Sequence, residues 1–330
     1  MRRRLVLPLL TLLLLASGLA HAAERAVPDT EPAVGAPDRI ALWPDGQVPG
    51  ESGPATVPDV IERSHDPALP DRYIDNVSAP YLVVYRPARP NGSALLVVPG
   101  GGYQRIVLDK EGTALVPAFV DRGGVTLFVL RYRLPAGRSD RQAALADAQR
   151  AMRVIRADAT RWRIDPQRIG VMGFSAGGHI AARLSNGFDA PVYPHRDAID
   201  ALSARPEVAL LIYPVIDMGA HAHTGSRARL LGPHPDAALQ ARFSMQDQVR
   251  TDTPPTFLVH AQDDTVVSVH NSLVYYQALL RAGVSTEMHL FPFGGHGFGV
   301  RIPAGLTVAQ WPELALRWIP SRHTEPARHD

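Results

Sequence analysis

The 330-residue sequence contains no cysteine. This absence excludes disulfide bonds, lipid-modified cysteines and metal sites built from thiolates. A cysteine-free chain suits the bacterial periplasm or exterior, although the absence alone does not establish that compartment. Internal repeats are missing too, so repeat architectures are excluded.

A strong excess of charge of either sign is also missing. The sequence has 34 basic and 32 acidic residues, and 45% of its residues are hydrophobic. Three arginines at positions 2–4 explain the net charge of +2, because 34 less these three leaves 31 basic against 32 acidic residues. The other basic residues follow no nucleic-acid-binding motif. We therefore expect a globular protein with no nucleic-acid partner.

Long apolar runs are missing after the first 22 residues. The three arginines precede an apolar segment at 5–15, and the small-residue sequence Ala-His-Ala at 20–22 follows. The apolar segment is short for a membrane-spanning helix of about 20 residues. We predict a Sec-type signal peptide over 1–22, cleaved before Ala23. The mature protein would then be periplasmic or secreted, without stable membrane insertion; a retained anchor is the alternative.

The remaining chain divides into an irregular arm and one large domain. Residues 23–80 are rich in Pro, Gly and Asp, which disfavours long helices and interior strands. We predict that they form an arm laid over the core. Apolar strands alternate with helical patterns over 81–320, and a tail follows at 321–330. The fold class is therefore predicted as α/β, with a doubly wound, mostly parallel sheet.

The alternation of predicted strands and helices in the large domain has one interruption. Strands are expected at 81–85, 94–98, 125–130, 168–174, 208–213, 256–260 and 286–291, and helices at 112–122, 142–160, 176–184, 268–281 and 308–319. Residues 217–252 interrupt this order. We interpret them as a short insertion over the carboxyl edge of the sheet, where doubly wound sheets bind ligands.

The strongest local motif is Gly-x-Ser-x-Gly, at 173–177 within RIGVMGFSAGGH. A predicted strand precedes it and a predicted helix follows, which is the context of a nucleophile elbow. The small residues leave room for the sharp turn that projects Ser175 above the sheet. We predict Ser175 as a nucleophile; the alternative is a serine that only caps the helix.

An acid and a base are expected later in the chain, in the order serine, Asp or Glu, histidine. One predicted strand ends in Asp263 and Asp264, and the next ends in the glycine-flanked His296. We predict His296 as the general base. Asp264 is preferred over Asp263 as the orienting acid, because Asp264 directly precedes the turn into the next helix.

Three consecutive glycines occur in LLVVPGGGYQ, at 95–104. Glycines after a buried strand allow another group to approach the backbone closely. Neither G-x-G-x-x-G nor a following Gly-Lys-Ser/Thr occurs, so dinucleotide and phosphate loops are excluded. We predict instead that the amides of Gly101, Gly102 and Ala176 form an oxyanion hole. Tyr103 is a candidate for the substrate pocket, with simple packing as the alternative.

These motifs together resemble the α/β-hydrolase fold in its esterase and lipase branch. More narrowly, the chain from about residue 40 to residue 299 resembles exported bacterial esterases of the acetyl-xylan-esterase-like group, many of them loosely labelled as xylanases. The segments that carry this resemblance are LWPDGQVPG, PGGGY, DKEG, RYRLP, DAQRAMRVIR, GFSAGGH and DTPPTFLVHAQDD. Two departures are visible: Val267 is followed by serine where relatives often have Val-Pro, and Pro99 precedes the glycines where esterases commonly have histidine.

The resemblance implies a serine carboxylic-ester hydrolase that removes acetyl groups from plant-wall sugars or oligosaccharides. A general short-chain carboxylesterase is the first alternative. An exported peptidase and an inactive carbohydrate-binding homologue are less favoured. A triad mechanism requires no metal and no organic cofactor, and its partner is a small-molecule or oligosaccharide ester.

The sequence leaves both a functional and a purely structural role open for several histidines. His221, His223 and His234 in the insertion suggest a metal site only loosely, and loop histidines facing solvent or substrate are favoured. His179, on the predicted helix after Ser175, is favoured as a packed residue.

Lys110 and Glu111 either form a surface ion pair, which is favoured, or orient the glycine loop. Trp162, Trp311 and Trp318 are expected to pack, and Trp43 stays open between packing and sugar stacking.

Overall fold

The computed structural model describes residues 25–27, 38–51, 58–135 and 140–322. Within them, eight strands form the main sheet in the order β12-β11-β10-β9-β6-β8-β5-β2. Neighbouring strands from β8 to β12 pair in parallel, whereas β5 and β2 pair antiparallel at one edge. The bounds are β2 Asp38–Ala41, β5 Tyr81–Tyr85, β6 Ala94–Val98, β8 Thr126–Arg131, β9 Ile169–Phe174, β10 Ala209–Ile212, β11 Thr256–Ala261 and β12 Thr286–Phe291.

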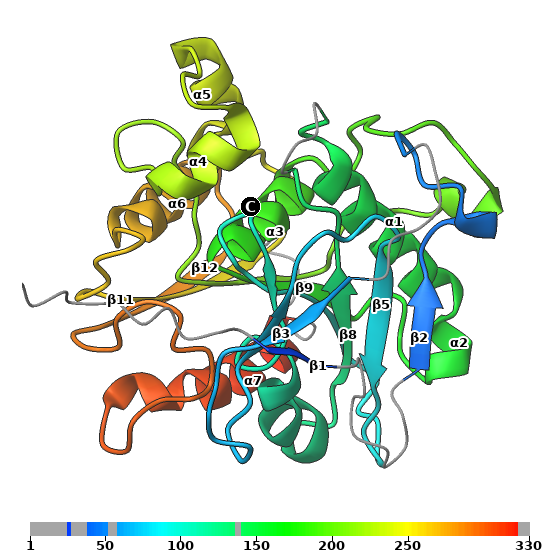
Figure 1. Ribbon diagram of the computed structural model, residues 1–330, viewed down its shortest axis with the longest axis horizontal. Coiled ribbons are helices and arrows are strands. Elements are labelled where there is room, and N and C mark those ends of the chain that lie inside the picture. Colours follow the sequence, from blue (N-terminus) through cyan, green and yellow to red (C-terminus); the bar gives the residue numbers. More distant parts are fainter. Residues whose placement is uncertain (1–24, 28–37, 52–57, 136–139, 323–330) are drawn as a thin grey trace, which may run out of the picture.

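Helices cover both faces of this sheet (Figure 1). One hydrophobic cluster joins the sheet to α1 (Ala143–Ala157), α3 (Ser175–Asn186) and α6 (His270–Arg281). A second cluster joins the other face to a π-helix, η3 (Val116–Arg122), and to α7 (Trp311–Arg322). The five central strands β6, β8, β9, β10 and β11 are buried along their whole length, which explains their uninterrupted apolar sequences. The predicted α/β class with a mostly parallel sheet is confirmed.

All seven predicted strands and five predicted helical segments occur, with ends shifted by a few residues. The segment predicted as a helix at 112–122 is a 3-10 turn, η2 (Thr113–Leu115), followed by η3. The last predicted helix begins with a 3-10 turn, η6 (Thr307–Gln310), before α7. A short helix, α2 (Ala159–Trp162), continues from the end of α1.

The predicted arm contains strands that its sequence did not predict. β1 (Arg25–Val27), β3 (Val60–Glu62), β4 (Arg72–Ile74) and β7 (Ile106–Val107) form a small antiparallel sheet, and β2 extends the edge of the main sheet. The predicted leader at 1–22 lies outside the described residues, as does most of the predicted tail. No helix in the described ranges has both the length and the apolar character needed to cross a membrane.

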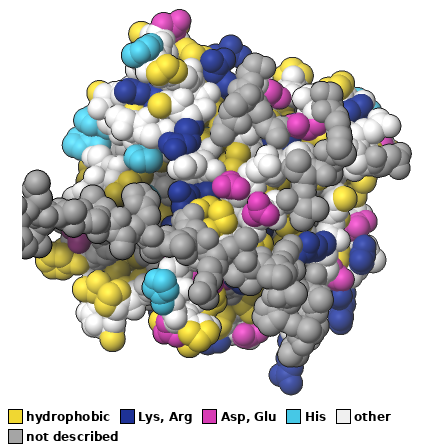
Figure 2. Space-filling model, in the orientation of Figure 1, with side chains coloured by type: hydrophobic (Ala, Val, Ile, Leu, Met, Phe, Trp, Pro, Cys, Tyr) yellow, Lys and Arg dark blue, Asp and Glu magenta, His cyan; other side chains and the backbone are white. Residues whose placement is uncertain are grey.

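The interruption at 217–252 folds into small elements at the carboxyl edge of the sheet. They are α4 (Thr224–Leu231), α5 (Ala237–Phe243) and a 3-10 turn, η5 (Met245–Asp247). Figure 1 shows α4 and α5 projecting beyond the sheet on the side of α6. Basic and histidine side chains gather over these two helices on the face drawn in Figure 2.

Candidate active site

Ser175 lies at the junction between β9 and α3, and its backbone is strained. Its φ angle is +50°, in the left-handed region that side chains other than glycine rarely adopt. Gly177 allows this turn to pack against the glycine loop, because a methyl group there would collide with the carbonyl oxygens of Val98 and Pro99. The Gly-x-Ser-x-Gly motif therefore forms a sharp strand-to-helix turn that holds the serine hydroxyl at the sheet edge.

The structure brings the three predicted triad residues together. The Ser175 Oγ lies 2.9 Å from His296 Nε2. On the other side of the imidazole, Nδ1 lies 2.7 Å from the Asp264 Oδ2. A carboxylate that accepts from Nδ1 leaves Nε2 able to take the serine proton. The side chains come from the ends of β9, β11 and β12, so the parallel sheet itself sets their spacing.

Asp264 is buried, whereas Asp263 is exposed and accepts the Gly295 amide at 2.8 Å. Burial alone would raise the pKa of Asp264. Hydrogen bonds from His260, His296 and the Val267 amide outweigh this effect and hold that pKa well below its usual range. Asp264 therefore stays ionised at neutral pH, as an acid that orients imidazole must.

His260, on β11, is a second histidine beside this carboxylate that the sequence reasoning missed. Its Nε2 lies 3.0 Å from the Val267 carbonyl oxygen and 3.3 Å from the Asp264 Oδ2. A carbonyl oxygen can only accept, so Nε2 carries the proton and Nδ1 accepts from the Ser272 hydroxyl at 2.8 Å. His260 thus donates toward Asp264 and the Val267 carbonyl oxygen, and stabilises the turn after β11.

The glycine loop has backbone angles that favour glycine. Gly101 has a φ of +134° and Gly102 a φ of +65°, and a side chain at Gly101 would collide with the Arg105 carbonyl. Ala176 is the second residue of α3, and the first amides of a helix have no intrahelical acceptors. The loop and the helix start therefore meet beside Ser175 with backbone amides available to a ligand.

Glu111 orients the glycine loop, the less favoured of its two sequence interpretations. Its buried carboxylate accepts the Gly100 amide at 2.7 Å and the Tyr213 hydroxyl at 2.9 Å. The Tyr213 hydroxyl accepts the Gly299 amide at 2.9 Å, and its ring packs edge-on against His296, 5.0 Å between centroids. Glu111 and Tyr213 therefore connect the glycine loop to the loop that carries His296.

Replacing Glu111 with glutamine should lower kcat for p-nitrophenyl acetate by about 10- to 100-fold. Glutamine has the same shape, but its amide group cannot accept from both the Gly100 amide and the Tyr213 hydroxyl without rearrangement, and one misplaced oxyanion donor costs about 100-fold or more. Glu287→Gln, at a partly exposed position on β12, is the matched control. Equal steady-state rates for the two variants would contradict this role.

Tyr103 does not line the cavity over Ser175; of its two predicted roles, the structure supports packing. It is fully buried, and its hydroxyl lies 2.7 Å from the His179 Nδ1. His179 Nε2 lies 2.8 Å from the Phe243 carbonyl, so this histidine donates there and accepts from Tyr103. Burial, together with nearby Arg183, lowers the pKa of His179 to about 3. His179 is therefore a neutral packing residue that ties the glycine loop to the insertion.

The cavity over Ser175 has a volume of about 230 Å³. Its lining combines the glycine loop, two of the predicted triad side chains, a set of basic residues and one residue of the insertion: Arg63, Gly101, Gly102, Arg105, Val107, Lys110, Glu111, Ser175, His223, Val266, His296 and Gly297. His223 caps α4 through its Nδ1, which lies 2.8 Å from the Ser226 Oγ. The insertion therefore forms one wall of the cavity.

The insertion histidines form no metal site in the structure. His223 faces the cavity, and His221 stacks on His270 with 4.3 Å between ring centroids. No group of three or more His, Cys, Asp or Glu side chains able to hold a metal occurs within the described ranges. His223 therefore faces the space where a substrate would bind, and His221 contacts another histidine ring.

The four tryptophans are packing residues. Trp162, Trp311 and Trp318 are buried, as expected. Trp43 is buried as well, and its Nε1 donates to the Asp147 Oδ1 at 3.0 Å. Trp43 therefore fixes the arm to α1 and does not face the cavity.

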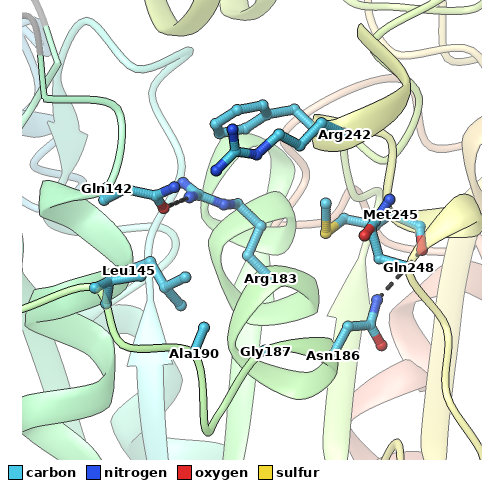
Figure 3. A pocket seen from close by; sticks show the side chains of 11 residues that line it. Gln142, Leu145, Arg183, Asn186, Gly187, Ala190, Arg242, Met245 and Gln248 are labelled. Carbon is cyan, nitrogen blue, oxygen red and sulfur yellow. Dashed lines mark hydrogen bonds between the residues drawn. The ribbon is translucent and has the colours of Figure 1, made fainter. Parts of the chain in front are cut away.

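A second cavity, of about 190 Å³, lies near the C-terminal end of α3 (Figure 3). Figure 3 shows Arg183 and Arg242 entering it from α3 and α5, with Gln142 bonded to Arg183. None of the predicted catalytic residues lines it. Of these two cavities, the one over Ser175 contains the predicted nucleophile and base.

Comparisons with known proteins identify a family and several similar chains. The family model BD-FAE matches residues 68–279. An acetyl ester-xyloside bifunctional hydrolase from Caldicellulosiruptor lactoaceticus has a solved structure that is 35% identical, with a TM-score of 0.73. That match covers 88% of this chain and 97% of the other, and places the protein in the α/β-hydrolase fold.

Two curated proteins are similar over shorter parts of their length. An acetylxylan esterase from Xylanibacter ruminicola is 35% identical over 223 residues, which are 66% of this chain and 43% of that protein. An endo-1,4-beta-xylanase B from Butyrivibrio fibrisolvens is 36% identical over 208 residues, 62% of this chain and 32% of that protein. The chain thus spans less than half the length of either.

Proposed function

Because this chain belongs to the BD-FAE family, we propose that it is a serine carboxylic-ester hydrolase that removes acetyl groups from plant-wall sugars or oligosaccharides. The observation that carries the chemistry is the continuous hydrogen-bonded line from Ser175 through His296 to Asp264, beside a glycine loop and inside a cavity. The sugar-ester substrate is supported by the names of the similar acetylxylan esterase and acetyl ester-xyloside hydrolase.

In the first half of the proposed reaction, the Ser175 Oγ attacks the acetyl carbonyl carbon while His296 Nε2 takes the hydroxyl proton. The oxyanion that forms accepts hydrogen bonds from backbone amides of Gly101, Gly102 and Ala176. The bond between the carbonyl carbon and the sugar oxygen then breaks. His296 passes the proton to the departing alcohol, and an acetyl-serine remains.

In the second half, water attacks the acetyl-serine while His296 takes one of its protons. Acetate leaves, and the proton returns to the Ser175 Oγ. Throughout both halves, the ionised Asp264 holds the imidazole in the required tautomer and stabilises the imidazolium when it forms.

The direct test is acetate release from acetylated xylo-oligosaccharides, measured beside hydrolysis of p-nitrophenyl acetate and p-nitrophenyl octanoate. We expect acetate release and a strong preference for the acetyl over the octanoyl ester, because the cavity of about 230 Å³ also has to hold the alcohol portion. An ethyl acetate hydrolase from Pseudomonas putida is also similar, 29% identical over 268 residues. Hydrolysis of simple esters without acetate release from the sugars would favour a general short-chain carboxylesterase instead.

A further inference from the structure

Two basic side chains line the cavity over Ser175 and belong to no step of the proposed reaction. Arg105 follows the glycine loop, and Lys110 lies beside the loop that carries His296. Both side chains line the cavity over Ser175 and are partly exposed to it. An ester bound at Ser175 would therefore lie in a cavity with these two basic side chains in its lining.

The local structure holds both cations in place. The Arg105 guanidinium lies over the Tyr73 ring, 4.1 Å from its centroid, and the Arg105 amide donates to the Gly101 carbonyl oxygen at 3.2 Å. A methyl group at Gly297 would lie 3.9 Å from the Lys110 Nζ, which places this ammonium one residue from His296. Neither side chain is a freely extended surface group.

Neither Arg105 nor Lys110 has a carboxylate partner of its own among the described residues. Arg63, the third basic residue of the lining, is paired with Asp71 at 2.8 Å. The two carboxylates of the site contact other groups: Glu111 accepts from the Gly100 amide and the Tyr213 hydroxyl, and Asp264 contacts His296. Arg105 and Lys110 form no ion pair with any residue in the described part of the chain.

The insertion adds further positive charge to the same side. Arg229 on α4 lies close enough to His223 to help lower the pKa of that histidine, after burial and His296 as the larger causes. Like Arg105, Arg229 has no carboxylate partner among the described residues. The cavity is thus basic on the oxyanion side, on the histidine side and toward the insertion, although the whole chain is close to neutral.

We propose that the cavity selects anionic sugar esters, namely acetylated oligosaccharides in which a uronic acid carboxylate lies next to the acetylated residue. This inference rests on the proposed sugar esterase function and specifies its substrate class. A carboxylate is the group that gives a plant-wall sugar a negative charge at neutral pH. Arg105 offers a planar fork that matches a carboxylate, and Lys110 adds a second donor.

The test compares two substrates that differ only in charge. One is a set of acetylated xylo-oligosaccharides with glucuronic acid side groups, and the other is the same set after reduction of the carboxyl group to a primary alcohol. We expect kcat/KM for acetate release to be about fivefold or more higher with the acidic set at low ionic strength. Partly exposed ion pairs each contribute about two- to fivefold, and added salt screens them.

The preference is expressed as the ratio of kcat/KM for the acidic set to kcat/KM for the reduced set. The variants Arg105→Gln and Lys110→Gln should each lower this ratio by about twofold or more, whatever happens to the absolute rate. The matched control is Arg317→Gln, because Arg317 is an exposed arginine on the outer helix α7 and should leave the ratio unchanged. In 0.5 M NaCl the wild-type ratio should approach one.

Equal kcat/KM for the two sets in the wild-type enzyme would overturn the inference while leaving the sugar esterase function standing. A preference that neither variant changes would also overturn it. If p-nitrophenyl acetate is hydrolysed but neither set releases acetate, the proposed function fails and this inference fails with it.

Discussion

Replacing Ser175 with alanine is expected to lower kcat for p-nitrophenyl acetate by at least about 10⁴-fold. The hydroxyl is the proposed nucleophile, and the remaining imidazole and carboxylate cannot form the acyl-enzyme without it. Loss of a triad nucleophile typically costs several powers of ten, and the oxyanion hole alone retains only weak hydrolysis. The measurement is steady-state hydrolysis at neutral pH with enough enzyme to detect the residual rate.

Folding of the Ser175→Ala variant provides the control. Ser175 has a φ of +50°, and alanine must adopt the same angle, so the strain of the turn persists in the variant. We expect the thermal midpoint to stay within a few degrees of wild type, since only one hydrogen bond, to His296, is lost. Wild-type activity in a folded variant would refute the proposed mechanism.

Replacing Asp264 with asparagine is expected to lower kcat by about 10³- to 10⁴-fold. Asparagine keeps the size of the side chain but removes the charge that stabilises imidazolium, and its amide nitrogen would favour the wrong tautomer of His296. Because the pKa of Asp264 is held below its usual range, the wild-type side chain stays charged across the neutral range, so the whole loss should be visible at pH 7.

Asp263→Asn is a closely matched control, one residue away with the same change of charge. The Asp263 side chain is exposed and contacts the Gly295 amide, not the imidazole. We expect less than about a tenfold change in kcat for this variant. Similar losses for both variants, or a larger loss for Asp263→Asn, would contradict the assignment of the acid.

The sequence predicts the central sheet well because its strands are buried on both faces. Segments such as TLFVL admit few interpretations other than a buried strand, and the fully buried β6 has the predicted bounds. The partly exposed β12 at the sheet edge also has the predicted bounds. The strands of the arm were not predicted, because each has three or four residues between prolines and glycines. These strands pair with partners distant in the chain, as β4 does with β7. Local sequence propensity does not reveal such long-range pairing.

The sequence also predicted which residues would meet at the site. The order serine, aspartate, histidine at three strand ends is enough, because parallel strands bring those ends to one edge. The choice of Asp264 over Asp263 followed from the turn that it precedes, and the structure places the Asp264 carboxylate against His296. Their catalytic roles remain predictions until the variants are measured.

The sequence did not show which residues hold the predicted triad and the glycine loop in place. Glu111 lies eleven positions after Gly100, and only the fold shows that its carboxylate accepts the Gly100 amide. His260 lies within an apolar strand, where a histidine is most simply interpreted as a buried packing residue. Tyr103 follows the glycines directly, yet its positive φ turns it into the interior. The position of Tyr103 next to the glycine loop therefore did not predict whether its side chain faces the cavity, because the backbone φ angle sets the direction of the side chain.

The most direct test of the central claim is covalent labelling of the wild-type enzyme with a fluorophosphonate, followed by mass spectrometry of its peptides. This reagent reacts with an activated serine and leaves a stable adduct at the attacked oxygen. The account predicts one adduct, on Ser175, formed in proportion to loss of esterase activity and much more slowly in Asp264→Asn. Complete loss of activity with the adduct on another serine, or full activity after Ser175 is labelled, would contradict it.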